Sequence, residues 1–268
     1  MKSKDSVIQR KAINRSFDQM DLPVSITNRQ VSRLCNNIYN FIVDKDNDKA
    51  YSKRKVTKNQ LLSWKIIKET DGKIFPTNAY MLLTGSEKYF PNASIQCALF
   101  KGKSKTDLLL TKKEFKGPLY QQIDDAYDFV IRYLDVKCTI EGIFRRETYE
   151  LPPIAIREII TNAVCHRSYL RPGKIQVALY DDRLEVTSPG NLDEILTIEK
   201  LKTGLSKIRN KAIASVFEYM EVVETWGRGI PKIMQFCKKH SLKEPEYINL
   251  EGGLKVVLYK NTSELIDV

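Results

Sequence analysis

Hydrophobic positions along the first half of the chain predict three helices and two strands. Helical spacing predicts amphipathic helices in TNRQVSRLCNNIYNFIV from Thr27 and GPLYQQIDDAYDFVIRYL from Gly117, and another in TKNQLLSWKIIKE. Alternation predicts a strand over SIQCALFKG, and TDLLLTKKEF predicts a neighbouring edge strand. The first ~25 residues are polar, so we expect a poorly ordered segment there.

The second half shows a hairpin pattern followed by two helices that glycine-containing loops introduce. KIQVALYDDRLEVTSPG alternates on both sides of Asp181-Asp182, which predicts two antiparallel strands. KTGLSKIRNKAIASVFEYM and ETWGRGIPKIMQFCKKHSL each predict a loop entering a helix, and GGLKVVLYK predicts a last strand. Because helices and antiparallel strands segregate, we expect an α+β fold.

We therefore divide the sequence into three parts. Residues 1–26 form the poorly ordered N-terminal segment, residues 27–150 a small N-terminal α/β domain, and residues 151–268 a second domain. The boundary is placed at Tyr149–Pro153, since Pro153 suits the first turn of the helix that follows.

That helix carries a polar stripe. In REIITNAVCHRSY, Glu158, Asn162 and His166 recur every four residues among apolar neighbours, which keeps them roughly in line on one face. A buried carboxylate without a partner is costly, so the stripe needs a cleft, a partner or solvent. A solvent-facing edge of an amphipathic helix explains the pattern as well as a binding cleft does.

Composition excludes several classes of protein. The 268 residues are 42% hydrophobic, as expected for a globular core, and no run approaches the ~20 apolar residues of a membrane span. The N-terminus has no signal-peptide pattern, so we expect a cytoplasmic protein. The five cysteines are scattered and form no CxxC, which argues against a zinc ribbon or a disulfide framework.

The net charge of +11 is concentrated in the first half of the chain, where SKRKVTK and KGKSK form basic clusters. Lysine and arginine in such clusters can bind a phosphate backbone and release its counterions. Solvated loop residues are an equally good interpretation of the same clusters.

The order of these features resembles the Bergerat (GHKL-type) ATP-binding fold of DNA gyrase, MutL and histidine kinases. More closely, REIITNAVCHRSY, YDDRLEVTSPGNL, SKIRNKAIA and ETWGRGIPKI are similar to RecG-related predicted transcriptional regulators, some described as ATP-dependent DNA helicases. The resemblance covers roughly residues 55–250. It implies that residues 151–268 form a Bergerat-type sandwich that binds ATP and Mg²⁺.

The resemblance also implies roles for individual residues. Glu158 matches the glutamate that polarises the attacking water, and Asn162 matches the Mg²⁺ ligand, for which an amide oxygen is suitable. His166 falls on the phosphate or ribose side, and Arg167 can reach a phosphate or pair with a surface carboxylate. The remaining candidates are Gly227, Arg228 and Gly229, in a phosphate-binding bend, and Thr203, Gly204, Ser206 and Asn210, in the loop that matches the mobile lid.

The chain departs from the superfamily at the base-binding position. Where typical members carry Asp-x-Gly, this sequence reads Ser188-Pro189-Gly190, so the expected acceptor for the adenine amine is a neutral hydroxyl. Charge-assisted hydrogen bonds are roughly twice as strong as neutral ones, so this substitution weakens the expected preference for adenine. No GxxxxGK[ST] phosphate loop is present, and we infer no helicase activity.

Relatives generally begin with an AlbA-like (Schlafen-type) domain and many end with a winged helix. This chain begins about where the first should end and stops before the second, so we expect a fragment whose DNA contacts lie mainly in the missing domains. Many Bergerat proteins dimerise, so a homodimer is also expected.

Three hypotheses follow. The first is a regulator with a nucleotide- and Mg²⁺-binding domain whose hydrolysis is slow or absent. The second is a non-catalytic scaffold or ligand-sensing module of a DNA-binding regulator. The third is nucleic-acid binding through the basic first half.

Overall fold

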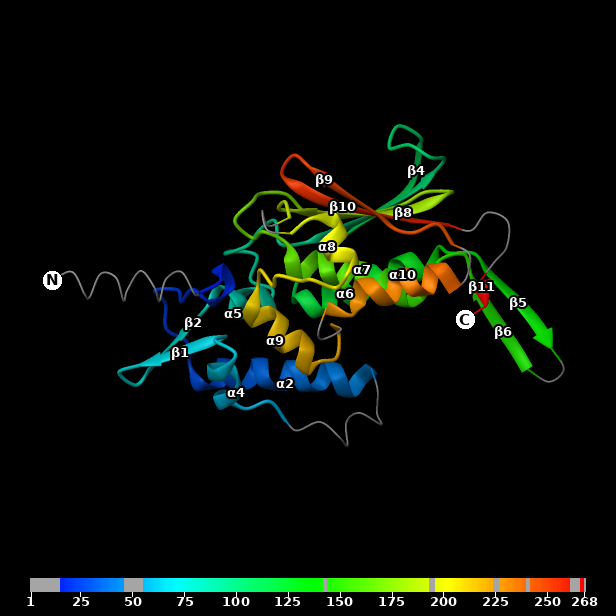
Figure 1. Ribbon diagram of the computed structural model, residues 1–268. Coiled ribbons are helices and arrows are strands. Elements are labelled where there is room, and N and C mark those ends of the chain that lie inside the picture. The colour runs from blue at the N-terminus through cyan, green and yellow to red at the C-terminus, as the bar shows by residue number, and fades with distance from the viewer. Residues whose placement is uncertain are drawn as a thin grey trace.

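The protein is built as layers, with helices packed on one face of a sheet (Figure 1). The computed structural model describes residues 15–45, 55–141, 144–192, 196–223, 227–239, 242–260 and 266–267. The helices are η1 (Phe17–Gln19), α2 (Asn28–Lys45), α4 (Lys58–Ser63), α5 (Asn78–Leu83), α6 (Leu119–Arg132), α7 (Pro153–His166), α8 (Ile198–Lys202), α9 (Lys211–Tyr219) and α10 (Gly229–Lys239). The strands are β1 (Ile67–Thr70), β2 (Lys73–Pro76), β3 (Ile95–Lys101), β4 (Leu108–Phe115), β5 (Val136–Glu141), β6 (Phe144–Tyr149), β7 (Ile175–Leu179), β8 (Arg183–Pro189), β9 (Glu246–Leu250), β10 (Gly253–Tyr259) and β11 (Ile266–Asp267).

The main sheet has six strands in the order β4-β3-β7-β8-β10-β9. Its neighbours pair antiparallel, except that β3 runs parallel to β7, with Ile95 opposite Ile175. Inward-facing residues alternate along the strands, as in Ile95 and Cys97 of β3 and Val177 of β7, which are fully buried. The sheet therefore takes strands from both sides of the predicted boundary at residue 150, and the division into two domains stays a prediction.

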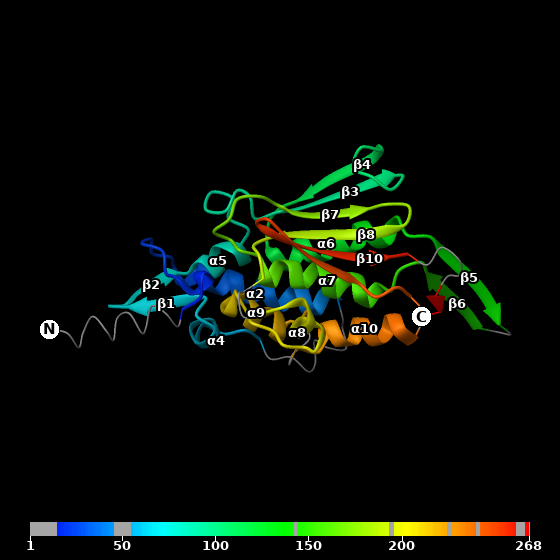
Figure 2. The same ribbon diagram turned by 45° about the horizontal axis from the view of Figure 1, so that its top comes forward.

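Helices α6, α7 and α10 lie directly under the sheet, with α2 and α9 below them (Figures 1 and 2). α7 is the central helix of this arrangement and contacts α6, α10 and strand β8. Its apolar residues Ile156, Ile160 and Val164 have no exposed surface. Burial of an aliphatic side chain stabilises a fold by about 1.5–3 kcal/mol, so α7 is fixed tightly under the sheet.

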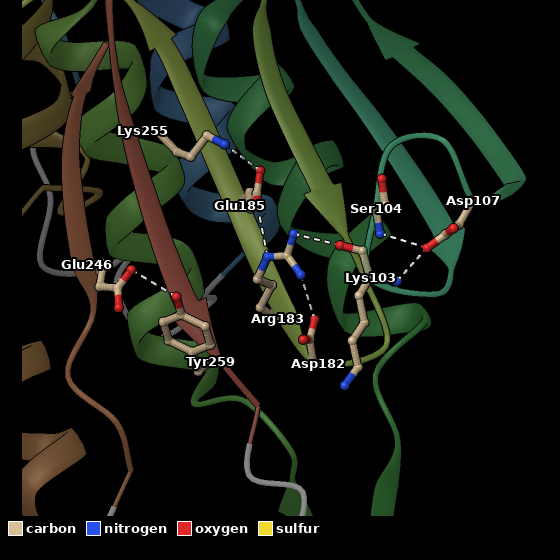
Figure 3. Close-up of polar contacts among 9 residues, drawn as sticks. All are labelled: Lys103, Ser104, Asp107, Asp182, Arg183, Glu185, Glu246, Lys255 and Tyr259. Carbon is tan, nitrogen blue, oxygen red and sulfur yellow. Dashed lines mark hydrogen bonds and ion pairs between the residues drawn. The ribbon is translucent and has the colours of Figure 1, made fainter.

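The opposite face of the sheet carries several polar side chains that pair with one another (Figure 3). Glu185 of β8 accepts from Arg183 Nε at 2.8 Å and forms an ion pair with Lys255 of β10 at 2.9 Å. The hydroxyl of Tyr259 donates to Glu246 across the β9–β10 pair at 2.8 Å. Cross-strand pairs of this kind contribute roughly 0.2–1 kcal/mol each, so they specify strand register more than they stabilise the fold.

Residues 15–26 differ from the expectation of a poorly ordered segment that ran to residue 26. The Asp18 carboxylate is fully buried and accepts a hydrogen bond from the backbone N–H of Ile213 at 2.9 Å, in the first turn of α9. Burial raises the pKa of Asp18. Ile26 N–H also donates to Ile74 O at 2.8 Å, which ties the segment to β2. Residues 1–14 lie outside the described residues.

The prediction of one helix over TKNQLLSWKIIKE is wrong in its second half. A Thr57 capping box starts α4, but the helix ends at Ser63, and Lys65 takes a left-handed conformation with φ 60°. The chain then enters β1, which pairs with β2 through the turn at TDGK. GGLKVVLYK forms β10, but it is not the last strand, because β11 follows it and pairs with β6.

Candidate functional site

The polar stripe on α7 faces a cavity. Pro153 lies in the first turn of this helix, and the N–H of Arg167 closes its end on Ala163 O. Glu158 is only 9% exposed, and it lines the cavity together with Asn162 and His166. The interpretation of the stripe as a solvent-facing helix edge is therefore wrong.

Glu158 and Asn162 form a hydrogen-bonded pair on successive turns of α7. The Nδ2 amide of Asn162 donates to Glu158 Oε1 at 2.8 Å. Because its nitrogen is directed to the carboxylate, the amide oxygen of Asn162 is the atom left for a metal ion. Gly229, at the start of α10, packs its Cα against the Glu158 carboxylate, and a Cβ at that position would overlap Oε1.

The two-glycine bend lies against the loop that follows α8. Gly204 and Gly227 both have positive φ, at 89° and 67°, and their backbones are in contact. A Cβ on Gly227 would overlap the carbonyl oxygen of Gly204, so only glycine permits this approach. The predicted lid loop and the predicted phosphate-binding bend are therefore neighbours in the structure.

The cavity has a volume of about 880 Å³, within the range of about 300–1,000 Å³ that is usual for small-molecule sites. It lies between α7, the end of the sheet that holds β8, β10 and β9, and the segment from α8 to α10. Much of its wall is apolar, including Leu254 and Val256 of β10, which suits a flat ring system. The predicted residues that line it are Glu158, Asn162, His166, Ser188, Gly190, Gly204, Ser206, Gly227 and Gly229.

Four predicted residues do not line the cavity. Arg167 is buried, donates to Gly173 O and lies over the ring of Tyr169. Asn210 is 1% exposed, and its amide donates to two backbone carbonyls at the end of α7. Thr203 is exposed and donates to Lys200 O, and Arg228 is exposed. The geometry gives Arg167 and Asn210 structural contacts, and it places Thr203 and Arg228 outside the cavity wall.

His166 lies in the cavity wall as a neutral imidazole. Burial, and then the charge of Arg209, lower its pKa to about 4, although a hydrogen bond with the Lys207 backbone acts in the opposite direction. At neutral pH the ring is therefore uncharged, and it offers hydrogen bonds but no positive charge to a ligand.

Hydrogen-bond acceptors surround the segment Ser188–Gly190. Ser188 Oγ donates its proton to Ala163 O at 3.0 Å, so only its lone pairs remain for a ligand. Asn191 Nδ2 donates to Leu250 O, and its Oδ1 is buried without a partner. Arg209 donates to the carbonyls of His166 and Asn191 and packs on Gly190. This end of the cavity is thus suited to a ligand edge that donates hydrogen bonds.

The charged groups in the cavity wall are mostly basic. Glu158 and Glu218 are acidic, whereas the basic residues are Arg15, Lys207, Arg209 and Lys211. This excess favours an anionic ligand. Among the described residues, no group of three or more His, Cys, Asp or Glu side chains is placed to hold a metal ion. A metal here would need oxygen ligands from Asn162 and from the ligand itself.

Tyr247, Arg209 and Asn191 are cavity residues that sequence reasoning missed. Tyr247 lies on β9, a strand whose short alternating segment EYINL passed unrecognised. Arg209 and Asn191 directly adjoin the predicted Asn210 and Gly190 in the sequence; Gly190 lines the cavity as well, whereas Asn210 does not.

In the described parts of the chain, none of the helices has the length and apolar character needed to cross a membrane.

Comparison with known proteins supports the resemblance found in the sequence. Residues 173–258 match an ATPase-like family described as "Putative ATP-dependent DNA helicase recG C-terminal", which confirms the family prediction over that segment. No curated protein matches the sequence.

Among solved structures, the DIP2311 protein from Corynebacterium diphtheriae is similar, with a TM-score of 0.73 and 18% identity. The match covers 95% of this chain and 49% of that one, so the chain spans about half of its neighbour's length. Together with the mixed six-stranded sheet, this likeness confirms the predicted α+β class with a Bergerat-type sandwich.

Proposed function

We propose, on the premise that residues 173–258 belong to the RecG-related ATPase-like family, that the cavity binds a nucleotide together with Mg²⁺. The observation that carries this proposal is the Glu158–Asn162 pair, which faces the Gly227–Gly229 bend across one cavity. The volume of the cavity, its excess of basic residues and the close approach of Gly229 to the Glu158 carboxylate fit a chain of phosphates.

In this proposal, three groups of the cavity wall bind Mg²⁺ and the phosphates and activate water. The Asn162 amide oxygen would hold Mg²⁺, which when bound neutralises phosphate charge. The start of α10 offers its N–H groups and positive dipole end to the phosphates. Glu158, fixed by the Asn162 amide, accepts a proton from the attacking water, and its buried position keeps it close to the bend.

Base recognition falls to neutral acceptors. Ser188 Oγ and Asn191 Oδ1 both present lone pairs, and these fit the 6-amino group of adenine better than a 6-oxo group. Because neither acceptor is charged, we expect a modest preference for adenine and weak affinity overall. Hydrolysis is expected to be slow, because Ser188 and Asn191 hold the base of the nucleotide without a charged hydrogen-bond partner.

Titration calorimetry with Mg·ATP and Mg·ITP tests this function, since the two ligands differ at the 6-position of the base. We expect ATP to bind several-fold more tightly than ITP. Glu158→Gln should retain ATP binding while any hydrolysis falls by about 10²–10⁴-fold, because a general base acts in the chemical step. Absence of binding and of any thermal shift at millimolar ATP would overturn the proposal.

The regulatory role, the DNA contacts and the homodimer are further proposals of the same kind. The turn between β3 and β4 carries the exposed lysines Lys103 and Lys105, which would be available to a phosphate backbone. Lys105 also donates to Gln176 at 3.2 Å, so it is partly engaged within the protein.

A further inference from the structure

A buried hydroxyl in the cavity wall lacks a hydrogen-bond partner. Tyr247 of β9 is 8% exposed, and its hydroxyl oxygen makes no hydrogen bond within the described protein. An unsatisfied buried polar group is costly, and native structures contain few of them. Such a group in a ligand cavity is explained most simply if the partner is the ligand.

The position of Tyr247 follows from the register of the sheet. It pairs with Val256 of β10, which in turn pairs with Val186 of β8, so the three residues form one row across the sheet. All three line the cavity. Tyr247 therefore projects from the edge of the sheet toward the helices, on the same side as α7.

Tyr247 and Glu158 line the same cavity, and the carboxylate acts on the phenol electrostatically. Burial, and then the charge of Glu158, raise the pKa of Tyr247, so the group remains protonated at neutral pH. A protonated phenol donates one hydrogen bond. An anionic oxygen brought close to Glu158 needs such donors around it, since like charges repel.

Other buried atoms without partners do not fit this role. Thr161 Oγ1, Arg167 Nε and Asn210 Oδ1 belong to residues outside the cavity wall. Asn191 lines the cavity, but its unpartnered Oδ1 is an acceptor and cannot donate to a phosphate oxygen. Among these atoms, only the Tyr247 hydroxyl is a hydrogen-bond donor of a residue in the cavity wall.

We propose that the Tyr247 hydroxyl donates a hydrogen bond to a phosphate oxygen of the nucleotide bound beside Glu158 and Asn162. The inference rests on the proposed function and adds to it a specific residue that binds the phosphates. It distinguishes ligands by their phosphates: a nucleoside without phosphate gains nothing from Tyr247, whereas a triphosphate does.

The test is Tyr247→Phe, which removes only the hydroxyl. The free variant should melt at the same temperature as the wild type or higher, because an unsatisfied group is lost. Its affinity for Mg·ATP should fall about ten-fold, as for a lost hydrogen bond to a charged group, while its affinity for adenosine is unchanged.

Tyr169→Phe is the matched control. Tyr169 is equally buried, but its hydroxyl donates to Val164 O at 3.1 Å and it does not line the cavity. This variant should lower the melting temperature and leave ATP affinity unchanged.

Three results would overturn the inference while leaving nucleotide binding in place. They are unchanged ATP affinity in Tyr247→Phe, equal losses for ATP and adenosine, and a melting temperature lowered as much as in the control. Failure of the wild-type protein to bind ATP would overturn the proposed function itself, and the role of Tyr247 with it.

Discussion

Acidification should destabilise this protein through His166. The unfolded chain binds a proton on this side chain near pH 6.5, whereas the folded protein does so only near pH 4. Between these values the unfolded state carries the extra proton, so stability falls as the pH falls. One pKa unit corresponds to about 1.36 kcal/mol, so the loss approaches about 3 kcal/mol by pH 4, with about 1.4 kcal/mol already lost at pH 5.5.

Urea unfolding of the wild type and of His166→Gln at pH 7.0, 5.5 and 4.5 measures this loss. Other groups titrate in the same range, and Asp18, whose pKa is raised, contributes with the opposite sign. Those contributions are present in both proteins and cancel in the difference. We expect the advantage of the wild type over the variant to shrink by about 1.2 kcal/mol between pH 7.0 and pH 5.5, because about 0.2 kcal/mol is already lost at pH 7.0. Parallel pH profiles would show that the imidazole is not held neutral in the folded protein.

Two further predictions concern the contacts of α7. Gly229→Ala inserts a methyl group into the Glu158 carboxylate, and we expect a loss of about 1–3 kcal/mol in stability with weaker Mg·ATP binding by calorimetry. Asn210→Ala leaves two buried carbonyls without donors, which should cost about 2–3 kcal/mol in urea unfolding, whereas the exposed Thr203→Ala should change stability by less than about 0.5 kcal/mol. Equal effects of the last two substitutions would contradict the assigned positions.

Local patterns predicted most of the elements around the site. The alternation of SIQCALFKG and of the Asp181-Asp182 hairpin gave β3, β7 and β8, because side-chain periodicity directly reflects a sheet with one buried face. The error over TKNQLLSWKIIKE arose because the apolar Ile66 and Ile67 fit a helix or a buried strand equally well. The left-handed conformation of Lys65 ends the helix and lets the chain enter a strand, and no residue pattern in the sequence predicts that conformation.

Side-chain direction limited the prediction of the site. The four-residue spacing correctly placed Glu158, Asn162 and His166 on one face, since a helix fixes relative directions. A loop does not fix the relative directions of its side chains in this way. In the segment before α9, Asn210 turned to the backbone of α7, while its neighbour Arg209 entered the cavity wall. The position of Tyr247 in the cavity wall depends on the strand register across β10, which spacing along the sequence does not reveal.

The parallel pairing of β3 with β7 has a consequence for how the chain folds during synthesis. The β7–β8 hairpin can form within microseconds, but β3 must find a strand about eighty residues further along the chain. At about 5–20 residues per second, the ribosome delivers that partner several seconds late. In that interval one edge of β3 is open to other chains, and chaperones that shield nascent strands would have the greatest effect on yield at this stage.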